Sequence, residues 1–353
     1  MLGFRVLDGR VPDEYALWLS IWDMSIQQDP HAHPDYVELW TRSSDRPTCA
    51  VYVDSQGGIL LPFVIRPLEV EPWVAEADGM LDIVSPYGYG GPYSWGNADS
   101  SKFWREFDNW AVRNGVVSFF MRFSLFQSLE DEFSGTVEAI SPNIVRCLGK
   151  SLDEIWMDYK HKVRKNVNKA CRMGVKIELD FEGSRKDEFT NLYEITMDRR
   201  NASDFYYFGS SFFTSIFTKL KGNFAIFHAL YDEKIVSTEL VLLSRKYIYS
   251  FLGGTDPRYF SVRPNDLLKH AIVKWGVENG MEAYILGGGP EGKDGIFKYK
   301  ESFAPNGEVP FRVGKCIYND EMYRYLVDCR RKWENSNERN WIPSPEFFPE
   351  YRA

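Results

Sequence analysis

The sequence predicts a mixed α/β (α+β) protein with two domains, each a twisted mixed sheet flanked by helices. Two observations lead to this expectation. At 353 residues the chain is longer than a single hydrophobic core usually supports. Each half also presents the same order of elements, which is a hairpin, a third strand, a turn with glycine and proline, a helix and a strand. The halves share this order without recognisable sequence identity, so the correspondence lies in architecture alone.

The first half begins with a helix expected over residues 13–24. The apolar runs "TCAVYV" and "GILLPFVI" are separated by the glycine turn "SQGG", which is typical of a hairpin. A third strand, "MLDIV", leads directly into the stretch "SPYGYGGP". A helix is expected over residues 100–113, because aromatic residues recur there at helical spacing, and the strand "VVSFFMRF" follows it.

The second half opens with one long helix, expected to run from Ser151 to a stop at Gly174. Ser151 and Glu154 have the spacing of a capping box, and apolar residues follow as a single stripe. A further helix covers residues 185–201, and three strands then form a meander: "NFAIFHALY", "KIVSTELVLL" and "YIYSFLGG". The last elements are a helix over 266–279, with Asn265 as its expected cap, and the strand "EAYIL".

Composition excludes several classes of function. A net charge of −8 and a pI near 5.4 argue against binding to duplex DNA or to an anionic membrane. The longest apolar run is too short to span a bilayer, and the five cysteines form no Cys-x-x-Cys pair, so we expect a cytoplasmic protein with reduced thiols. We expect no metal site, because His31 and His33 in "HAH" have no third ligand at useful spacing and are interpreted as a surface turn.

Common catalytic motifs are absent or incomplete. The segment "GGGPEGK" has the spacing of a phosphate-binding loop, but Asp294 follows it where a magnesium-binding hydroxyl is required. A glycine-rich exit from a strand is the preferred interpretation. The sequence also contains no Gly-x-Ser-x-Gly elbow and no evident Ser/His or Cys/His pair, which disfavours hydrolysis through a covalent intermediate.

Two lysine-containing segments remain as candidates for chemistry. The segment "YKHKVRKNVNKACRMG" is the most basic part of an acidic chain, and it is either a solvated helix face or a site for phosphates or RNA. The segment "DGIFKYKESFAP", expected as a loop, places Lys300 among aromatic residues. Partial desolvation there would strengthen its interaction with a developing oxyanion, whereas the alternative is an ordinary surface lysine.

Five segments in the same order resemble the Fem-type aminoacyltransferases of peptidoglycan bridge formation and related tandem GNAT-fold acyltransferases. They are "SPYGYGGP", "KVRKNVNKACRMGV", "FLGGTDPRY", "RPNDLLKHAIVKWG" and "LGGGPEGKDGIFKYKESFAP". The resemblance implies two tandem GNAT-like domains, with domain 1 over residues 1–148, completed by 306–353, and domain 2 over 149–305. It also implies transfer of an aminoacyl group from aminoacyl-tRNA to an amine of a cell-wall precursor or another nucleotide-linked or small-molecule acceptor, without a cofactor.

The resemblance also implies functional residues. The family's phenylalanine-lysine pair corresponds to Tyr299 and Lys300, and Lys300 would stabilise charge on the transferred group or on the departing ribose hydroxyl. Tyr87 and Tyr89 of "SPYGYGGP" would line the substrate site, with a purely structural turn as the alternative. Acceptor recognition is expected at Thr196, Arg199, Tyr206 and Tyr207, and recognition of donor phosphates at Arg164, Lys165, Lys169, Arg258 and Arg263.

Two alternative functions keep the same fold. An N-acyltransferase could take its acyl group from coenzyme A, although Pro257 and Pro264 remove backbone amides where related acetyltransferases bind the pyrophosphate. Arg258 and Arg263 could bind phosphate there by their side chains instead. The other alternative is a binding module that has lost catalytic activity.

Overall fold

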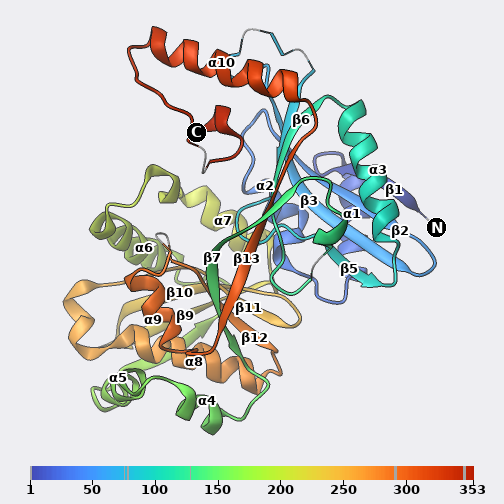
Figure 1. Ribbon diagram of the computed structural model, residues 1–353. Coiled ribbons are helices and arrows are strands. Elements are labelled where there is room, and N and C mark those ends of the chain that lie inside the picture. The colour runs from blue at the N-terminus through green and yellow to red at the C-terminus, as the bar shows by residue number, and fades with distance from the viewer. Residues whose placement is uncertain (1, 75, 78, 128, 290–291, 345–346) are drawn as a thin grey trace. The chain divides into compact units, whose positions relative to one another are not determined.

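The structure, a computed structural model, describes residues 2–74, 76, 77, 79–127, 129–289, 292–344 and 347–353. It divides into two compact units (Figure 1). Unit 1 comprises Met1–Ile140 and Phe311–Ala353, and unit 2 comprises Ser141–Pro310. The chain leaves unit 1 within β7 (Thr136–Cys147) and returns within β13 (Glu308–Ile317). The domain boundaries predicted after residues 148 and 305 thus lie near these two long strands.

Unit 1 is a mixed sheet with helices against both faces. Its strand order is β1-β2-β3-β4-β6-β13, and β5 pairs with β3. Strands β4 and β6 are parallel and are joined through α3, whose buried aromatic residues pack on one face of β3. Helix α1 packs on the opposite face. The elements are β1 (Gly3–Asp8), α1 (Pro12–Met24), α2 (Pro34–Glu38), β2 (Arg46–Val53), β3 (Gly57–Pro67), β4 (Leu81–Val84), β5 (Tyr93–Gly96), α3 (Ser100–Arg113), β6 (Val116–Arg122) and α10 (Asp320–Ser336).

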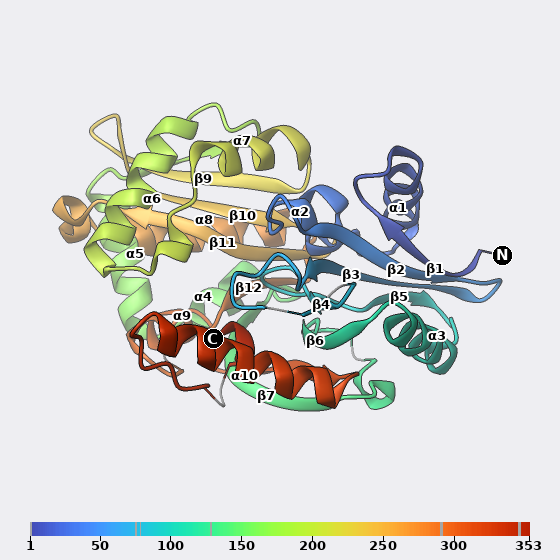
Figure 2. The ribbon, with the colours of Figure 1, turned by 90° about the horizontal axis from the view of Figure 1, so that it is seen from above.

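Unit 2 repeats this plan with the strand order β8-β9-β10-β11-β12-β7. Strands β11 and β12 are parallel and are joined through α8. Helices α5 and α8 cover one face of the sheet, and α6 covers the other over β10 and β11 (Figures 1 and 2). The elements are α4 (Leu152–Asp158), α5 (His161–Arg172), β8 (Lys176–Asp180), α6 (Lys186–Arg200), α7 (Ser210–Lys219), β9 (Phe224–Tyr231), β10 (Lys234–Leu243), β11 (Tyr247–Thr255), α8 (Pro264–Glu278), β12 (Ala283–Gly287) and α9 (Gly295–Glu301).

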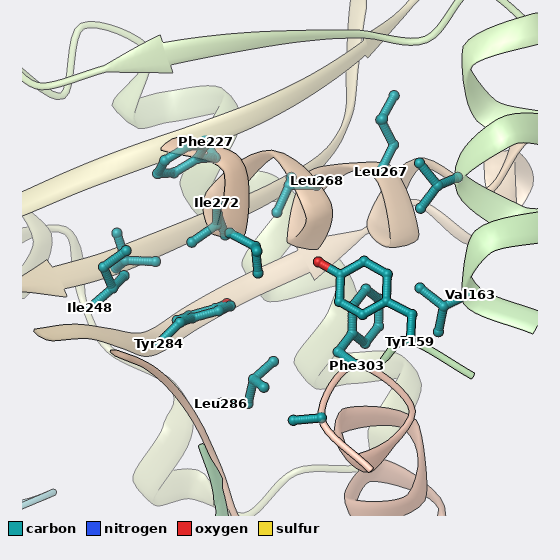
Figure 3. Packing of buried hydrophobic residues seen from close by; sticks show 14 of the residues in the cluster. Tyr159, Val163, Phe227, Ile248, Leu267, Leu268, Ile272, Tyr284, Leu286 and Phe303 are labelled. Carbon is teal, nitrogen blue, oxygen red and sulfur yellow. The ribbon is translucent and has the colours of Figure 1, made fainter. Parts of the chain in front are cut away.

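Alternation along β9 explains why unit 2 has helices on both faces. Ala225, Phe227 and Ala229 point into the core shared with α5 and α8, shown from close by in Figure 3. Phe224 points to the opposite face, where its ring contacts Phe217 of α7 at a centroid distance of 5.2 Å. A strand that is apolar on both sides needs cover on both faces, as this continuous apolar run predicts.

The duplicated order of elements is confirmed. In each unit an antiparallel hairpin precedes a parallel pair of strands connected through a helix, namely β4-α3-β6 in unit 1 and β11-α8-β12 in unit 2. The two halves share this order without recognisable sequence identity, because many apolar sequences satisfy the same pattern of strands and helices. The predicted fold class, two tandem mixed sheets flanked by helices, is correct.

Strands β11 and β12 pair over three residues and then separate, which positions the site described below. They pair only from Tyr247 opposite Ala283 to Tyr249 opposite Ile285. Strand β11 then continues to Thr255 and β12 to Gly287, with no further β11–β12 pairing in the described part of the chain. We call the region beyond Tyr249 and Ile285 the strand separation. In open α/β sheets such strand ends are where ligands bind.

The single helix predicted from Ser151 to Gly174 is wrong. The backbone is extended at Tyr159 and Lys160, which divides the segment into α4 and α5. The Tyr159 ring packs against Phe303 at 5.5 Å, and the Lys160 N–H donates to the carbonyl of Ser302 at 2.9 Å. These contacts with a distant segment outweigh the local preference for a continuous helix. The predicted capping box of Ser151 and Glu154 is confirmed.

Two smaller predictions near the site are also wrong. Helix α8 starts at Pro264 with Arg263 as its cap, two residues before the expected cap at Asn265, because the proline ring is already suited to the first helical position. The segment around Lys300 is the helix α9 and not a loop. Asp294 caps this helix, since its carboxylate accepts the N–H of Phe297 at 2.8 Å.

Candidate active site

Lys300 lies on α9 and reaches back over the end of β12. Its ammonium donates to the carbonyl of Gly288 at 2.6 Å. A Cβ atom at Gly287, where φ is +80°, would lie 3.3 Å from the same ammonium. Glycine at this position therefore gives both the backbone conformation and the space that Lys300 needs. The glycine-rich segment thus serves as a platform for the lysine.

Burial changes the acidity of Lys300. It lowers the pKa of the ammonium to about 8, and the positive charge of Lys269 acts in the same direction. Glu239 and Asp294 oppose the change, while Arg200 adds to it. Lys300 is therefore mostly protonated at pH 7, yet gives up its proton more readily than an exposed lysine.

A buried polar network lies where β10, β11, β12 and α8 meet. The Lys269 ammonium donates to Glu239 at 2.6 Å, to the Tyr284 hydroxyl at 3.0 Å and to the Ser250 hydroxyl at 3.2 Å. Ser250 and Tyr284 both donate to the Glu239 carboxylate. Glu239 and Lys269 expose only 4% and 6% of their surface, so each charge depends on the other for compensation.

Sequence reasoning missed Glu239 and Lys269. A signal was present in both cases, because each is a charged residue within a segment that is otherwise suited to burial. Arg200, at the end of α6, was also missed although its charge acts on Lys300. Only the tertiary structure brings Arg200 and Lys300 within electrostatic reach of each other.

Tyr299 faces the start of α8. Its hydroxyl accepts a hydrogen bond from the Asn265 amide at 2.9 Å, and Asn166 donates to the nearby Asp266 at 3.1 Å. Burial raises the pKa of the Tyr299 phenol well above its usual value, and the charges of Asp266 and Glu239 reinforce this. Tyr299 is therefore a neutral phenol that links α9 to α8.

The expected acceptor-binding residues occupy different environments. The Thr196 hydroxyl donates to the carbonyl of Leu192 at 2.9 Å and accepts the N–H of Thr255 at 3.0 Å, which attaches α6 to β11. Tyr207 donates to Asp198 at 3.0 Å, and the Arg199 guanidinium lies 5.2 Å from the ring of Phe260. The backbone carbonyl of Tyr206 accepts a bond from Tyr193. Of these four residues, Arg199 and Tyr207 are the exposed ones.

The expected donor-binding residues fall into two groups. Arg164 donates to the carbonyls of Met157 and Tyr159 and so caps the end of α4. Arg164 and Lys165 line one pocket, whose residues do not include Lys169. Arg258 lines a different pocket, and its guanidinium forms an ion pair with the Asp256 carboxylate at 2.6 Å. Arg263 is exposed at the start of α8.

In unit 1 the stretch "SPYGYGGP" is tightly packed. A Cβ atom at Gly88, where φ is +93°, would lie 2.9 Å from the imidazole of His31. The Tyr89 ring contacts His31 at 5.2 Å, and the Tyr87 carbonyl accepts the Tyr36 hydroxyl at 2.8 Å. The glycines therefore permit close approach within unit 1, and a substrate-binding role for Tyr87 and Tyr89 stays a prediction.

The expectation that "HAH" is a surface turn is wrong. His31 and His33 expose only 2% and 7% of their surface. His31 lies 2.8 Å from Asp29, and His33 packs on the ring of Trp22, so both imidazoles are buried among aromatic side chains. Within the described residues, no group of three or more His, Cys, Asp or Glu side chains could hold a metal ion.

Comparison with known proteins identifies the fold. Residues 157–301 match the family model described as "Acetyltransferase (GNAT) domain". No curated protein matches the sequence. The crystal structure of FemX superposes with a TM-score of 0.66 at 12% identity, covering 88% of this chain and 97% of that one. This protein has the fold of FemX.

Two further solved structures with a different name share this fold. The C-terminal domain of a putative lysylphosphatidylglycerol synthetase from Agrobacterium fabrum has a TM-score of 0.54 at 13% identity, covering 90% of this chain and 95% of its own. L-PGS from Bacillus licheniformis has a TM-score of 0.53 at 14% identity, with coverages of 91% and 96%. The match to the GNAT family model supports an acyltransferase. In the part of the chain that the structure describes, every helix is too short or too polar to cross a membrane.

Proposed function

We propose that the protein transfers an aminoacyl group from aminoacyl-tRNA to the amine of an acceptor such as a cell-wall precursor, forming an amide. The observation that carries this proposal is the partly buried ammonium of Lys300, with a lowered pKa, at the end of β12 in a GNAT fold. Because aminoacyl-tRNA is made in the cytoplasm, the proposal places the protein there.

In this reaction the amine attacks the ester carbonyl, and negative charge develops on the carbonyl oxygen. The Lys300 ammonium would stabilise that charge and then protonate the departing ribose oxygen, while the attacking amine loses a proton. The carbon–nitrogen bond forms as the carbon–oxygen bond breaks. The acceptor amine is itself the nucleophile, so the reaction needs no catalytic serine or cysteine.

An acyl-coenzyme A donor is the second candidate, favoured by the match to an acetyltransferase family model. The start of α8 opposes it. Pro264 has no N–H to offer a pyrophosphate, and the carboxyl group of Asp266 is buried in the first helical turn, where it would repel one when ionised. Arg258 is already paired with Asp256. These features support a donor other than coenzyme A.

The test is filter binding of a total aminoacyl-tRNA pool beside the same pool stripped of amino acids, at two salt concentrations. We expect salt-sensitive retention of the charged pool, with the retained amino acid identifying the transferred group. Equal retention of both pools would reject the aminoacyl donor. Acyl-coenzyme A binding, measured in parallel by calorimetry, would then favour the second candidate, and binding without any amide product would favour a non-catalytic module.

A further inference from the structure

A pocket of about 310 Å³ lies between α4 and α5 in unit 2. Its size is near the lower end of the range for small-molecule sites, about 300–1,000 Å³. The lining residues are polar or basic apart from one aromatic ring. They are Trp156, His161, Arg164, Lys165, Asn168 and Arg172.

The charge of this pocket is positive. No carboxylate is among its described lining residues, whereas the pocket beside Arg258 is lined by Glu188, Glu233 and Asp256. Lys165 and Arg172 are exposed on the same helix. Hydrogen bonds from Arg164 to carbonyls at the end of α4 hold its guanidinium in the pocket wall. Such a concentration of cations in an acidic chain attracts an anionic ligand.

Trp156 adds an aromatic surface to these cations. Its indole packs against His270 at 5.1 Å and against Tyr159 at 6.0 Å, and the same side chain lines the pocket. A flat ring beside Lys and Arg side chains suits a ligand that has both a base to stack and phosphates to pair. We infer that the pocket between α4 and α5 is a nucleotide subsite.

This subsite is joined to the helix that bears Lys300. Lys160, between α4 and α5, forms an ion pair with Glu301 at 2.5 Å and donates its N–H to Ser302 at 2.9 Å. Tyr159 packs on Phe303 just beyond α9, as Figure 3 shows. A nucleotide in the pocket would therefore lie close to the segment that carries the catalytic candidate. This assignment rests on the proposed function: the bound nucleotide would belong to the single-stranded end of the aminoacyl-tRNA donor.

The test measures binding to the full chain by calorimetry, without any aminoacyl group. Three probes distinguish the sources of the nucleotide: a short single-stranded RNA, adenosine 3′,5′-bisphosphate as the nucleotide part of coenzyme A, and inorganic phosphate. We expect the RNA to bind most tightly, and its affinity to fall with salt. Bisphosphate binding alone would still support a nucleotide subsite and would assign it to a coenzyme carrier. Equal affinity for all three probes would overturn the proposal.

Variants assign the binding to this pocket. Lys165→Ala and Arg172→Ala should each reduce the salt slope of log K by about 0.7, and Trp156→Ala should weaken RNA binding about tenfold or more. Because Trp156→Phe keeps a stacking ring, it should retain RNA binding even if Trp156→Ala disturbs folding. Lys221→Ala, an exposed lysine outside the pocket, is the matched control and should bind as the parent does. Unchanged binding in Lys165→Ala, Arg172→Ala and Trp156→Ala would contradict the inference.

The inference and the proposed function fail in different ways. If nucleotide binding depends on the pocket but no amide is formed from aminoacyl-tRNA, the subsite stands and the proposed reaction does not. If Lys300-dependent transfer proceeds with an unchanged donor KM in the pocket variants, the reaction stands and the subsite is rejected.

Discussion

The ammonium of Lys269 lies 2.6 Å from the carboxylate of Glu239, and both side chains are almost completely buried. Residues thirty positions apart in the chain thus form a charge pair beneath the strand separation, within electrostatic reach of Lys300. Burying two charges is expensive, and the pair compensates for this only when both partners are present.

Lys269→Met should therefore destabilise the protein by about 3–5 kcal/mol, because Glu239 would be left buried without its counter-charge. The double variant Lys269→Met/Glu239→Gln should recover part of this loss. Urea unfolding followed by circular dichroism measures both. Lys274→Met is the matched control, since its i,i+4 pair with Glu278 is exposed and should contribute less than about 0.5 kcal/mol. Similar losses for Lys269→Met and Lys274→Met would show that the buried pair has no special role.

Lys300→Met should lower the rate of acyl transfer about a hundredfold or more, the scale typical of one oxyanion donor. Lys298→Met on the same helix is the control, because Lys298 is exposed and should change the rate little. Single-turnover transfer separates this effect from binding. A Lys300→Met protein that keeps the parent rate would remove Lys300 from the mechanism.

The pKa of Lys300 determines the expected pH dependence. Since burial lowers this pKa to about 8, and the ammonium is the active form, kcat/KM should fall as pH rises through about 8. The free energy of unfolding should respond to pH in the opposite direction. Between pH 8 and the unfolded pKa near 10.5 the unfolded chain binds more protons, so the free energy of unfolding should rise across that interval. Lys300→Met should abolish both responses, and a rate that instead increases above pH 8 would identify Lys300 as a base.

Gly88→Ala should destabilise unit 1 by about 2–4 kcal/mol, because the added methyl group meets His31 at 2.9 Å and φ is positive. Gly79→Ala tests the backbone term alone. Its φ is also positive, at +71°, but no atom lies within 4 Å of the new Cβ, so a loss of about 1–2 kcal/mol is expected. Thermal unfolding of both variants gives the difference, and equal losses would argue against the packing of Gly88 on His31.

Much of the fold could be predicted from local sequence signals. The capping box of Ser151 and Glu154, the helical spacing of the aromatic residues in α3 and the β2–β3 hairpin each depend on neighbouring residues, and all three are found. The short strand β5, the strands β1, β7, β8 and β13, and the helices α2, α7, α9 and α10 were not predicted. Several of these are short or polar on one side, and they are stabilised mainly by the elements they pack against.

The candidate site shows the same division. From the sequence alone, Lys300 could be singled out by its aromatic neighbours and by a resemblance between ordered motifs. Tertiary structure alone decided that Lys300 lies on a helix and that Glu239 and Lys269 form a buried ion pair near it. It also decided that the predicted helix is interrupted at Tyr159, which leaves a basic pocket between α4 and α5. Caps, turns and periodicity act between residues a few positions apart, whereas burial, charge pairing and altered pKa values depend on which distant segments meet.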